Sequence, residues 1–447
     1  MSFINNLSQE CSTTETDLFS VPLTQTSIES TTVVEYNPIS SISDTSPLEY
    51  LITGNGMDYI DPSSIQLYVR VQIVRGAAGL DIDNTHHIAP VNLLLHSMFS
   101  DVEIKLNDVV ISSNNSTYGY RSYLETLMSY GSDAKNSQLE SSLYYQDTAG
   151  GDAMEFADPI DQNSLNNGLK KRHAYFIRNN GSVEMMGSLH SDISFQGKFL
   201  PSDVNLRIKL MRAKDQFCLM SSAANPAFRL KLLECKLLVR RVKLTSSVYL
   251  AHAKGLEIST AKYPIKRIVC KSITIPRGLL SHTLEHICTG QLPNRIVLGL
   301  VRNEAFNGSS TTNPYNFRHF NLTQLKKVSL DGHSKHGIRM LECDYDRGVY
   351  IESYLSLFQS TGKYRSDEGN TISRGDYPAG YTLYGFNLSQ DNSTENACLN
   401  LVREGNLRLD FKFSAPLPET INLIIYSEFD GLIEIDRLKN VITDFTQ

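Results

Sequence analysis

Two histidines and a glutamate, His282, Glu285 and His286, form the string in this 447-residue chain that most resembles a catalytic motif. The order His-x-x-Glu-His matches the pattern of one class of zinc peptidases. On a helix, His282 and His286 would share one face as zinc ligands and Glu285 would serve as the base. Pro276 and Gly278 precede the string and β-rich segments flank it. We therefore expect a polar loop here rather than a metal-binding helix.

Other candidate sites are weaker. His86 and His87 stand side by side without cysteines or carboxylates at ligand spacing. The sequence contains no Gly-x-Gly-x-x-Gly fingerprint, no Walker loop and no Gly-x-Ser-x-Gly elbow. We therefore predict no catalytic, cofactor-binding or metal-binding residues, no cofactor and no enzyme activity.

The charge balance argues against a dedicated nucleic-acid-binding protein. The formal net charge is -6, whereas such proteins usually carry a basic domain or stripe. The densest basic patch is Lys170-Lys171-Arg172-His173. We interpret it as a solvated loop or helix end, with an inward-facing contact to nucleic acid as the alternative.

The cysteines and the apolar residues indicate where the chain is made. The seven cysteines are scattered and form no Cys-x-x-Cys pair, so we interpret them as free thiols in a reducing compartment, mostly filling the core. No segment reaches the roughly 18 apolar residues that a membrane span needs. The first 22 residues lack the basic start and apolar run of a signal peptide, so we expect synthesis in the cytoplasm.

Alternating apolar residues predict that the chain is built mainly from strands. In residues 64–74, Ile65, Leu67, Val69, Val71 and Ile73 fall on one face, and polar or amphipathic residues fall on the other. Residues 101–107 repeat this period of two, which is typical of a strand with one buried face. Residues 294–301 are almost continuously apolar, as expected for a strand buried on both faces.

The same reasoning places the remaining elements. Further strands are expected at residues 31–36, 183–186, 192–200, 204–210, 228–244, 267–275, 337–342, 381–387, 407–413 and 421–426. Helices are expected at residues 118–130, 246–256 and 350–358, with a weaker candidate at 138–145. These helices are too short to form a helical domain, so they read as insertions in the loops of a β-sandwich.

One internal repeat suggests that the chain contains two sandwiches. Asn205-Leu-Arg-Ile-Lys-Leu210 returns as Asn406-Leu-Arg-Leu-Asp-Phe411, near the end of the second β-rich half. Tandem duplication of one sandwich is the economical explanation. We predict an all-β chain with a flexible N-terminal arm at 1–29, a first sandwich at 30–245 and a second at 246–447.

Several blocks resemble one family of proteins. They are Asn92 to Asn107, Tyr118 to Glu125, Gly290 to Val301, Asn303 to Gly308 and Asn313 to Phe317. Together they resemble the major capsid protein, or hexon, of Polinton/Maverick elements and adintoviruses. The resemblance spans about residues 30–436 and leaves the polar arm outside.

The resemblance implies a double jelly roll, two antiparallel eight-stranded sandwiches in one chain. It implies a homotrimer with a pseudo-hexameric outline and a lattice of trimers that forms an icosahedral virion capsid around double-stranded DNA. A penton or minor capsid protein and a non-specific contact with packaged DNA are further implied partners. Two alternatives stay open: a minor capsid (penton) protein of the same kind of element, and a carbohydrate-binding β-sandwich protein.

Overall fold

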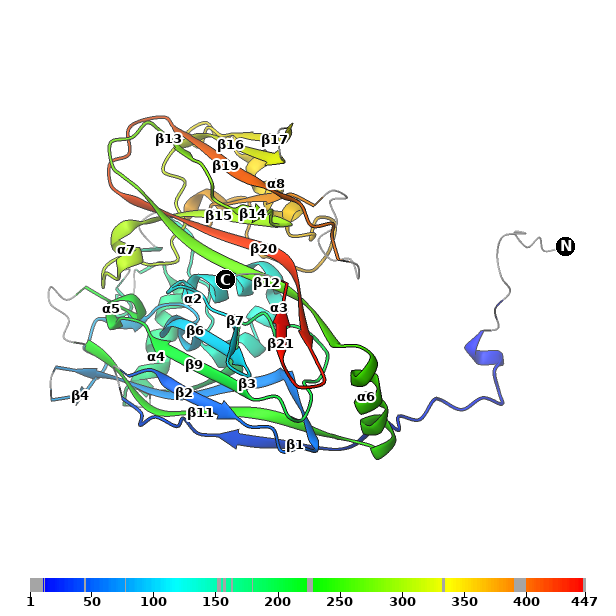
Figure 1. The fold of residues 1–447 in the computed structure, drawn as a ribbon. Coiled ribbons are helices and arrows are strands. Elements are labelled where there is room, and N and C mark those ends of the chain that lie inside the picture. The colour runs from blue at the N-terminus through cyan, green and yellow to red at the C-terminus, as the bar shows by residue number, and fades with distance from the viewer. Residues whose placement is uncertain are drawn as a thin grey trace.

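The computed structural model describes residues 11, 13–43, 46–76, 78–150, 154–155, 158–161, 164–178, 180–222, 228–331, 334–389 and 399–444. Most strands of this part belong to four antiparallel sheets, which pair into two sandwiches. In Figure 1 the first sandwich forms the lower half of the molecule and the second forms the upper half.

The first sandwich uses strands between Ile28 and Leu244. One sheet has the order β1-β11-β3-β8, with β4 also beside β3, and the other has the order β2-β9-β6-β7. The strands are β1 (Ile28–Tyr36), β2 (Leu48–Ile52), β3 (Asp58–Arg75), β4 (Leu80–Asp81), β6 (Phe99–Leu106), β7 (Val109–Ser112), β8 (Ser182–Ser188), β9 (Leu206–Arg212) and β11 (Phe228–Leu244). A small separate sheet pairs β5 (Ile88–Pro90) with β10 (Leu219–Ser221).

The second sandwich uses strands between Ala261 and Thr443. Its sheets have the orders β12-β20-β15-β18 and β13-β19-β16-β17, with β21 beside β20 and β14 beside β19. The strands are β12 (Ala261–Ile275), β13 (Ser281–Leu284), β14 (Thr289–Gln291), β15 (Arg295–Arg302), β16 (Leu322–Asp331), β17 (Ser334–Glu342), β18 (Leu383–Asn387), β19 (Glu404–Phe413), β20 (Ile421–Ile435) and β21 (Val441–Thr443).

The two sandwiches share one topology. If the eight main strands of each are numbered in chain order, both contain the sheets 1-8-3-6 and 2-7-4-5. This pairing of eight antiparallel strands in two sheets is a jelly roll. The repeated Asn-Leu-Arg segments begin strand seven of each roll, β9 and β19. Leu210 pairs with Leu48 on strand two, and Phe411 pairs with His282 at the matching place.

The alternating patterns form the strands that they predict. On β3, the five apolar residues from Ile65 to Ile73 are buried, and Gln66 and Arg70 between them are exposed. The inner residues of β15 are buried without alternation, since this strand has covered faces on both sides. The sequence at 228–244, which allowed one or two strands, forms the single long strand β11.

The helices lie in the connections between strands. They are α1 (Leu94–Ser97), α2 (Tyr118–Ser129), α3 (Ser132–Lys135), α4 (Asn167–Arg178), α5 (Asp215–Cys218), α6 (Ser246–Ile258), α7 (Asn303–Asn307) and α8 (Ile351–Ser360), with 3-10 turns at Thr14–Thr16, Gln138–Ser142 and Tyr377–Ala379. The helices predicted from the residues at 118–130, 246–256 and 350–358 are confirmed. The weaker candidate at 138–145 is only a 3-10 turn.

One predicted strand is wrong. Residues 192–200 form a turn followed by irregular chain. The backbone N–H of Ser194 donates to the carbonyl of Ser191, and Phe195 points outward with 57% of its surface exposed. The turn directs Asp192 into a buried ion pair with Arg121, so a charged contact replaces the strand that the alternation predicted.

Candidate assembly site

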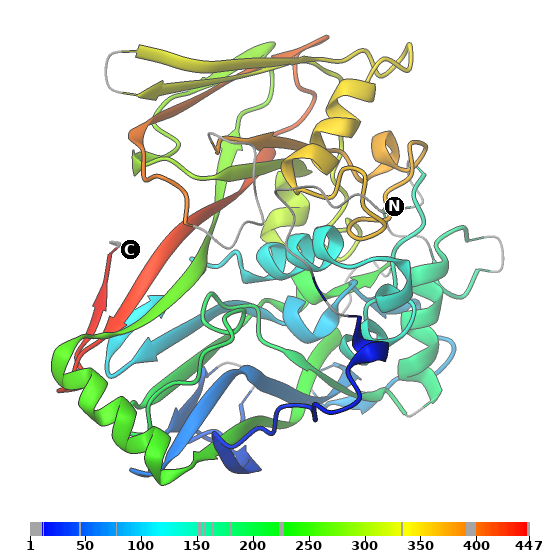
Figure 2. The same ribbon diagram turned by 90° about the vertical axis from the view of Figure 1, so that its right-hand side faces the viewer.

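Helix α2 lies between the two sandwiches and joins them. Figure 2 shows it, in cyan, between the sheets of the first sandwich and those of the second. Every residue from Tyr118 to Met128 is buried. The ring of Tyr123 stacks on Tyr315 of the second half at 4.1 Å between ring centres, and Tyr120 packs against Phe317. The two rolls therefore share an aromatic core and form one unit.

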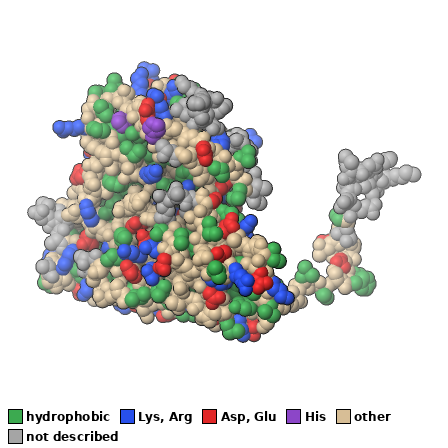
Figure 3. Space-filling model, viewed as in Figure 1, with side chains coloured by type: hydrophobic (Ala, Val, Ile, Leu, Met, Phe, Trp, Pro, Cys, Tyr) green, Lys and Arg blue, Asp and Glu red, His purple; other side chains and the backbone are tan. Residues whose placement is uncertain are grey.

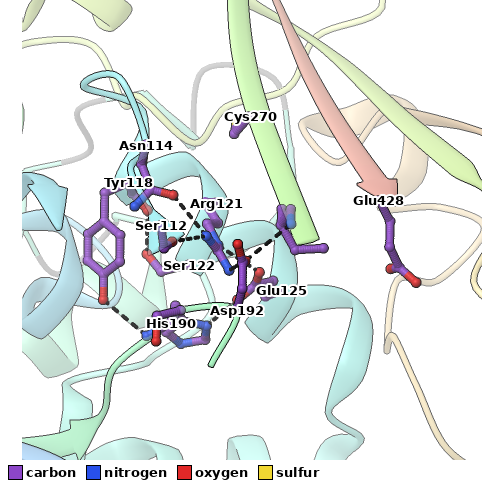
Figure 4. A network of polar contacts seen from close by, with 12 residues as sticks. Ser112, Asn114, Tyr118, Arg121, Ser122, Glu125, His190, Asp192, Cys270 and Glu428 are labelled. Atoms are coloured by element: carbon purple, nitrogen blue, oxygen red, sulfur yellow. Dashed lines mark hydrogen bonds and ion pairs between the residues drawn. The ribbon is translucent and has the colours of Figure 1, made fainter. Parts of the chain in front are cut away.

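The charged residues of α2 form a network inside this junction (Figure 4). The Nη2 atom of Arg121 donates to Oδ1 of Asp192 at 2.6 Å, and Nε donates to Oε1 of Glu125 at 3.0 Å. Arg121 also donates to Ser112, the last residue of β7, and to Asn114 just after that strand. The remaining oxygen of Glu125 lies 2.6 Å from Nδ1 of His190.

The network reaches the second sandwich through its backbone. The backbone N–H of Ile268, on β12, donates to Oδ1 of Asp192 at 3.2 Å. Thr117, directly before α2, donates from its hydroxyl to the carbonyl of Cys270 on the same strand at 3.0 Å. These bonds fix the angle at which β12 crosses the first sandwich.

The pKa shifts in this network follow from burial and pairing. Burial raises the pKa of Asp192, and the nearby Arg121 only partly offsets that rise. Burial also acts to raise the pKa of Glu125, but Arg121 and His190 outweigh it and the pKa is lowered. Glu125 is therefore the firmly ionised partner of the guanidinium. All of these groups hold one another in place, which suits a structural junction rather than a substrate site.

A second buried ion pair corrects the interpretation of the basic patch. Arg172 is fully buried on α4, and its Nη2 donates to Oδ1 of Asp147 at 2.6 Å. The other oxygen of Asp147 accepts a bond from Asn313 of the second half at 3.0 Å. His173 is also buried, so Lys170 to His173 do not form a solvated basic surface. For the alternative, an inward-facing contact with nucleic acid, only Lys170 and Lys171 are placed toward the surface, because Arg172 and His173 are buried.

The expected polar loop from His282 to His286 is wrong for its first part, because residues 281–284 form strand β13, and only Glu285 and His286 lie in an exposed loop. A strand does not place residues i and i+4 at the spacing that a helical zinc site uses. His286 instead contacts Asn406, and Glu285 contacts Arg408 at 3.5 Å. The pairing of β13 with β19 determines this geometry, and the local sequence gives little sign of it.

The other histidine pair binds neighbouring acids. Nδ1 of His86 lies 2.8 Å from Asp83, and Nδ1 of His87 lies 2.6 Å from Asp158. Among the residues that the structure describes, no three His, Cys, Asp or Glu side chains are placed to hold a metal ion. In the same part of the chain, no helix is both long and apolar enough to cross a membrane.

The described cysteines mostly fill the core, as predicted, and many tyrosines do so too. Cys218, Cys235, Cys270, Cys288 and Cys343 are buried free thiols, Cys11 is an exposed one, and Cys398 lies outside the described residues. The largest fully buried side chains include Tyr118, Tyr120, Tyr123, Tyr144, Tyr315, Tyr377, Tyr381 and Tyr384. The aromatic character of α2 all round the helix is the sequence signal that could have identified it as a buried junction.

Strand β1 forms an exposed outer edge of its sheet. Strand β1 hydrogen-bonds to β11 on one side, and no other described strand pairs with it. Most of its residues are exposed, including Val33 at 66%. An edge strand of this kind offers unpaired backbone groups to another chain.

Comparison with known proteins gives one relative by sequence. The chain is 26% identical over 436 residues to F54H12.2, an uncharacterized protein of Caenorhabditis elegans, covering 95% of this chain and 99% of that protein. No protein-family model matches the chain.

Solved structures match over almost the whole chain. A chain in the structure of the Sputnik virophage matches with a TM-score of 0.66 at 9% identity, covering 98% of this chain and 93% of that one. The Faustovirus major capsid protein matches with a TM-score of 0.55 at 7% identity, over 93% and 92% of the two chains. The mavirus major capsid protein matches with a TM-score of 0.52 at 11% identity, over 100% and 97%. The chain therefore has the double jelly-roll fold of these major capsid proteins.

Proposed function

We propose that this chain is the major capsid protein of a Polinton/Maverick element or an adintovirus. One observation carries the proposal: two complete jelly rolls of identical strand order are fused through a buried junction in one chain. The match to the Sputnik virophage chain over nearly the full length supports it. An element carried in an animal genome would also account for the nematode relative of equal length.

The proposed action is assembly rather than catalysis. Three copies, each with two similar rolls, would form a homotrimer with six similar corners, and such trimers can tile an icosahedral shell around double-stranded DNA. We expect the trimer contacts to bury roughly 2,000 Å² or more, as obligate interfaces do. A penton or minor capsid protein would close the remaining positions of the shell, and contact with packaged DNA would be non-specific.

The proposal assigns each part of the chain to one domain. Residues 1–29 form the arm, residues 30–245 the first roll and residues 246–447 the second roll, although β1 already begins at Ile28. The protein would be made in the host cytoplasm and would end as a component of the virion.

Two alternatives fit less well. A minor capsid (penton) protein usually has one jelly roll, whereas this chain has two sandwiches. A carbohydrate-binding sandwich would favour disulfides and exposed aromatic side chains, whereas five described cysteines are buried thiols and many tyrosines are fully buried.

The experiment is native mass measurement of the purified chain together with negative-stain imaging. We expect trimers of the 50.1 kDa chain, or particles and lattices built from them. A chain that stays monomeric across the concentration range, including under conditions that favour assembly such as raised salt, contradicts the proposal.

A further inference from the structure

The segment before β1 carries four large apolar side chains in water. Leu18, Phe19, Val21 and Leu23 are 78, 96, 83 and 102% exposed. Figure 1 shows this arm leaving the body near α6, and Figure 3 shows hydrophobic side chains along it. Exposed apolar clusters of this kind usually mark a surface that is covered in the working assembly.

A backbone hydrogen bond directly before β1 ties the arm to the body. The carbonyl of Ser27 accepts a hydrogen bond from the backbone N–H of Thr245, directly before α6, at 3.0 Å. An extended chain covers about 3.3–3.6 Å per residue, so Phe19 can lie up to about 29 Å from this point. The arm can therefore reach a neighbouring molecule that packs beside α6.

A groove on the body matches the arm in size and apolar character. It has a volume of about 510 Å³ and lies between α6, the start of β12 and residues 197–201. Tyr59, Phe199, Leu244, Leu256 and Tyr263 give it an apolar lining. This volume lies within the range of clefts that enclose small ligands, which suits a few inserted side chains.

Helix α6 itself lacks a covering layer. None of its residues is buried, and Leu250 and Ile258 are 59 and 89% exposed. The helix rests on the body through partly buried residues such as Val248 and Tyr249, and its other apolar residues stay exposed, which suits an element that packs against another chain.

The charges of arm and groove are complementary. The ionisable residues that line the groove include Lys198, His252 and Lys262, and among the described residues no Asp or Glu lines it. The arm contains Glu15 and Asp17, and the chain has no Lys, Arg or His before Arg70. Opposite charges on the two surfaces steer them together and fix their register.

The order of residues in the arm suits an extended ligand. Phe19, Val21 and Leu23 alternate with Ser20 and Pro22. In an extended chain the three apolar side chains point to one side, so they can enter the groove together.

We propose that the arm of one copy docks in the α6 groove of a neighbouring copy in the assembled protein. The apolar side chains from Phe19 to Leu23 fill the groove, and Glu15 and Asp17 lie beside Lys198 and Lys262. Because the arm points away from its own body, the occupant is a second copy. The inference rests on the proposed function, and it names the contact that fastens one copy to the next.

Disulfide capture between two separately purified variants tests this contact directly. One carries Phe19→Cys and the other Leu256→Cys, both with Cys11→Ser, and they are mixed before mild oxidation. Since each contributes one new thiol, a disulfide between them can form only between copies. We expect covalent dimers in a denaturing gel, and far fewer when Leu165→Cys, at an exposed site before α4, replaces Leu256→Cys. Equal yields in the two mixtures overturn the proposal.

The same thiols also test whether an arm folds onto its own body. A single chain with both Phe19→Cys and Leu256→Cys can form an internal disulfide, which peptide mass mapping identifies. A purely internal disulfide, with no product in the mixing experiment, overturns the choice of a second copy.

Association measurements separate this inference from the proposed function. We expect Phe19→Ser with Leu23→Ser to raise the apparent dissociation constant between copies at least about 100-fold, as loss of interface anchors does. Leu165→Ser, at another exposed apolar residue, serves as the control. Lys262→Glu should also weaken association, and Asp17→Lys should partly restore it. If the parent and the arm variant assemble equally, only the arm contact is wrong. If the parent never assembles, the capsid proposal fails and the arm contact fails with it.

Discussion

The two jelly rolls carry an insertion at the same point and use it differently. In both, a helix rich in aromatic residues follows strand five: α2 after β7 and α8 after β17. Helix α2 is buried along nearly its whole length and touches both sandwiches. Helix α8 packs mainly on β18 of its own roll and buries only Ser353, Ser356, Leu357 and Ser360. The same loop thus serves as a joint in one roll and as a cover in the other.

Different surroundings require different side chains. Because α2 has no face in solvent, its charged residues must be paired inside the protein. Arg121 and Glu125 form such a pair. The buried face of α8 is formed largely by serines, which let the helix lie very close to β18. The comparison indicates that the first insertion holds the two rolls together, whereas the second covers its own roll.

The largest expected effect follows from breaking the joint at Arg121. Arg121→Met leaves Glu125 and Asp192 buried without their cation, and loss of one partner of a buried pair costs about 3–5 kcal/mol. Chemical denaturation of the variant and the parent should show this loss in the free energy of unfolding. Arg347→Met is the matched control in the second insertion, because Arg347 is 83% exposed and should change stability by less than about 0.5 kcal/mol. Equal effects of the two substitutions would contradict the distinction between joint and cover.

Most of the strands could be predicted from the sequence, but the contacts of α2 that join the two rolls could not. Strands such as β3 and β6 show a clean period of two, because each has one buried face and one face toward solvent. The sequence does not predict the short strand β2 or strand β16, which lies between β19 and β17, because β2 is brief and the polar residues of β16 interrupt its pattern. The double roll itself was indicated by the six-residue repeat on strand seven.

The contacts of α2 depend on residues that are distant in the sequence. Arg121 meets Asp192, and Tyr123 meets Tyr315, so no local pattern could pair them. The strand predicted at 192–200 is wrong for the same reason, since nothing in the local sequence indicates that Asp192 turns inward to Arg121.

Each half contains one lysine whose burial should make the free energy of unfolding depend on pH. Burial lowers the pKa of Lys135, beside α2, to about 7, and that of Lys327, on β16, to about 8. Above these values the folded protein binds fewer protons than the unfolded chain, whose lysine pKa is about 10.4. The free energy of unfolding should therefore rise with pH, from about 7 for Lys135 and from about 8 for Lys327, by up to about 1.4 kcal/mol per unit.

Substituting each lysine separates their contributions. Lys135→Met should remove up to about 3 kcal/mol of the stability gained between pH 7 and pH 9, and Lys327→Met should remove less. Unfolding measured at half-unit steps of pH gives the two onsets, with Lys254→Met on the exposed face of α6 as the control. The assignment is wrong if the variants keep the parent's slope.

A smaller effect is expected where an insertion touches strand six of its roll. A Cβ atom at Gly385 would lie 1.9 Å from Oγ of Ser360 on α8, and one at Gly187 on β8 would lie 2.5 Å from Oγ of Ser142. Ala at either position should cost about 1–3 kcal/mol, with the larger loss at Gly385, where a backbone carbonyl also lies 3.0 Å away. Thermal unfolding should show both losses, and Ser360→Gly should partly rescue Gly385→Ala. Gly375→Ala is the control, since the nearest atom to its Cβ would be 3.8 Å away. A cost at Gly375 as large as at Gly385 would show that contact with the helix is not the cause.

The smallest effect is expected at His282, whose place in the second roll matches that of Leu48 in the first. Leu48 is completely buried opposite Leu210, so Leu48→Ala should cost about 2–5 kcal/mol. His282, opposite Phe411, is only half-buried on the short strand β13, so His282→Ala should cost less than about 1 kcal/mol. Denaturant unfolding of the two variants measures the contrast, and added zinc should leave the parent unchanged. A loss at His282 as large as at Leu48 would mean that strand two stabilises both rolls equally.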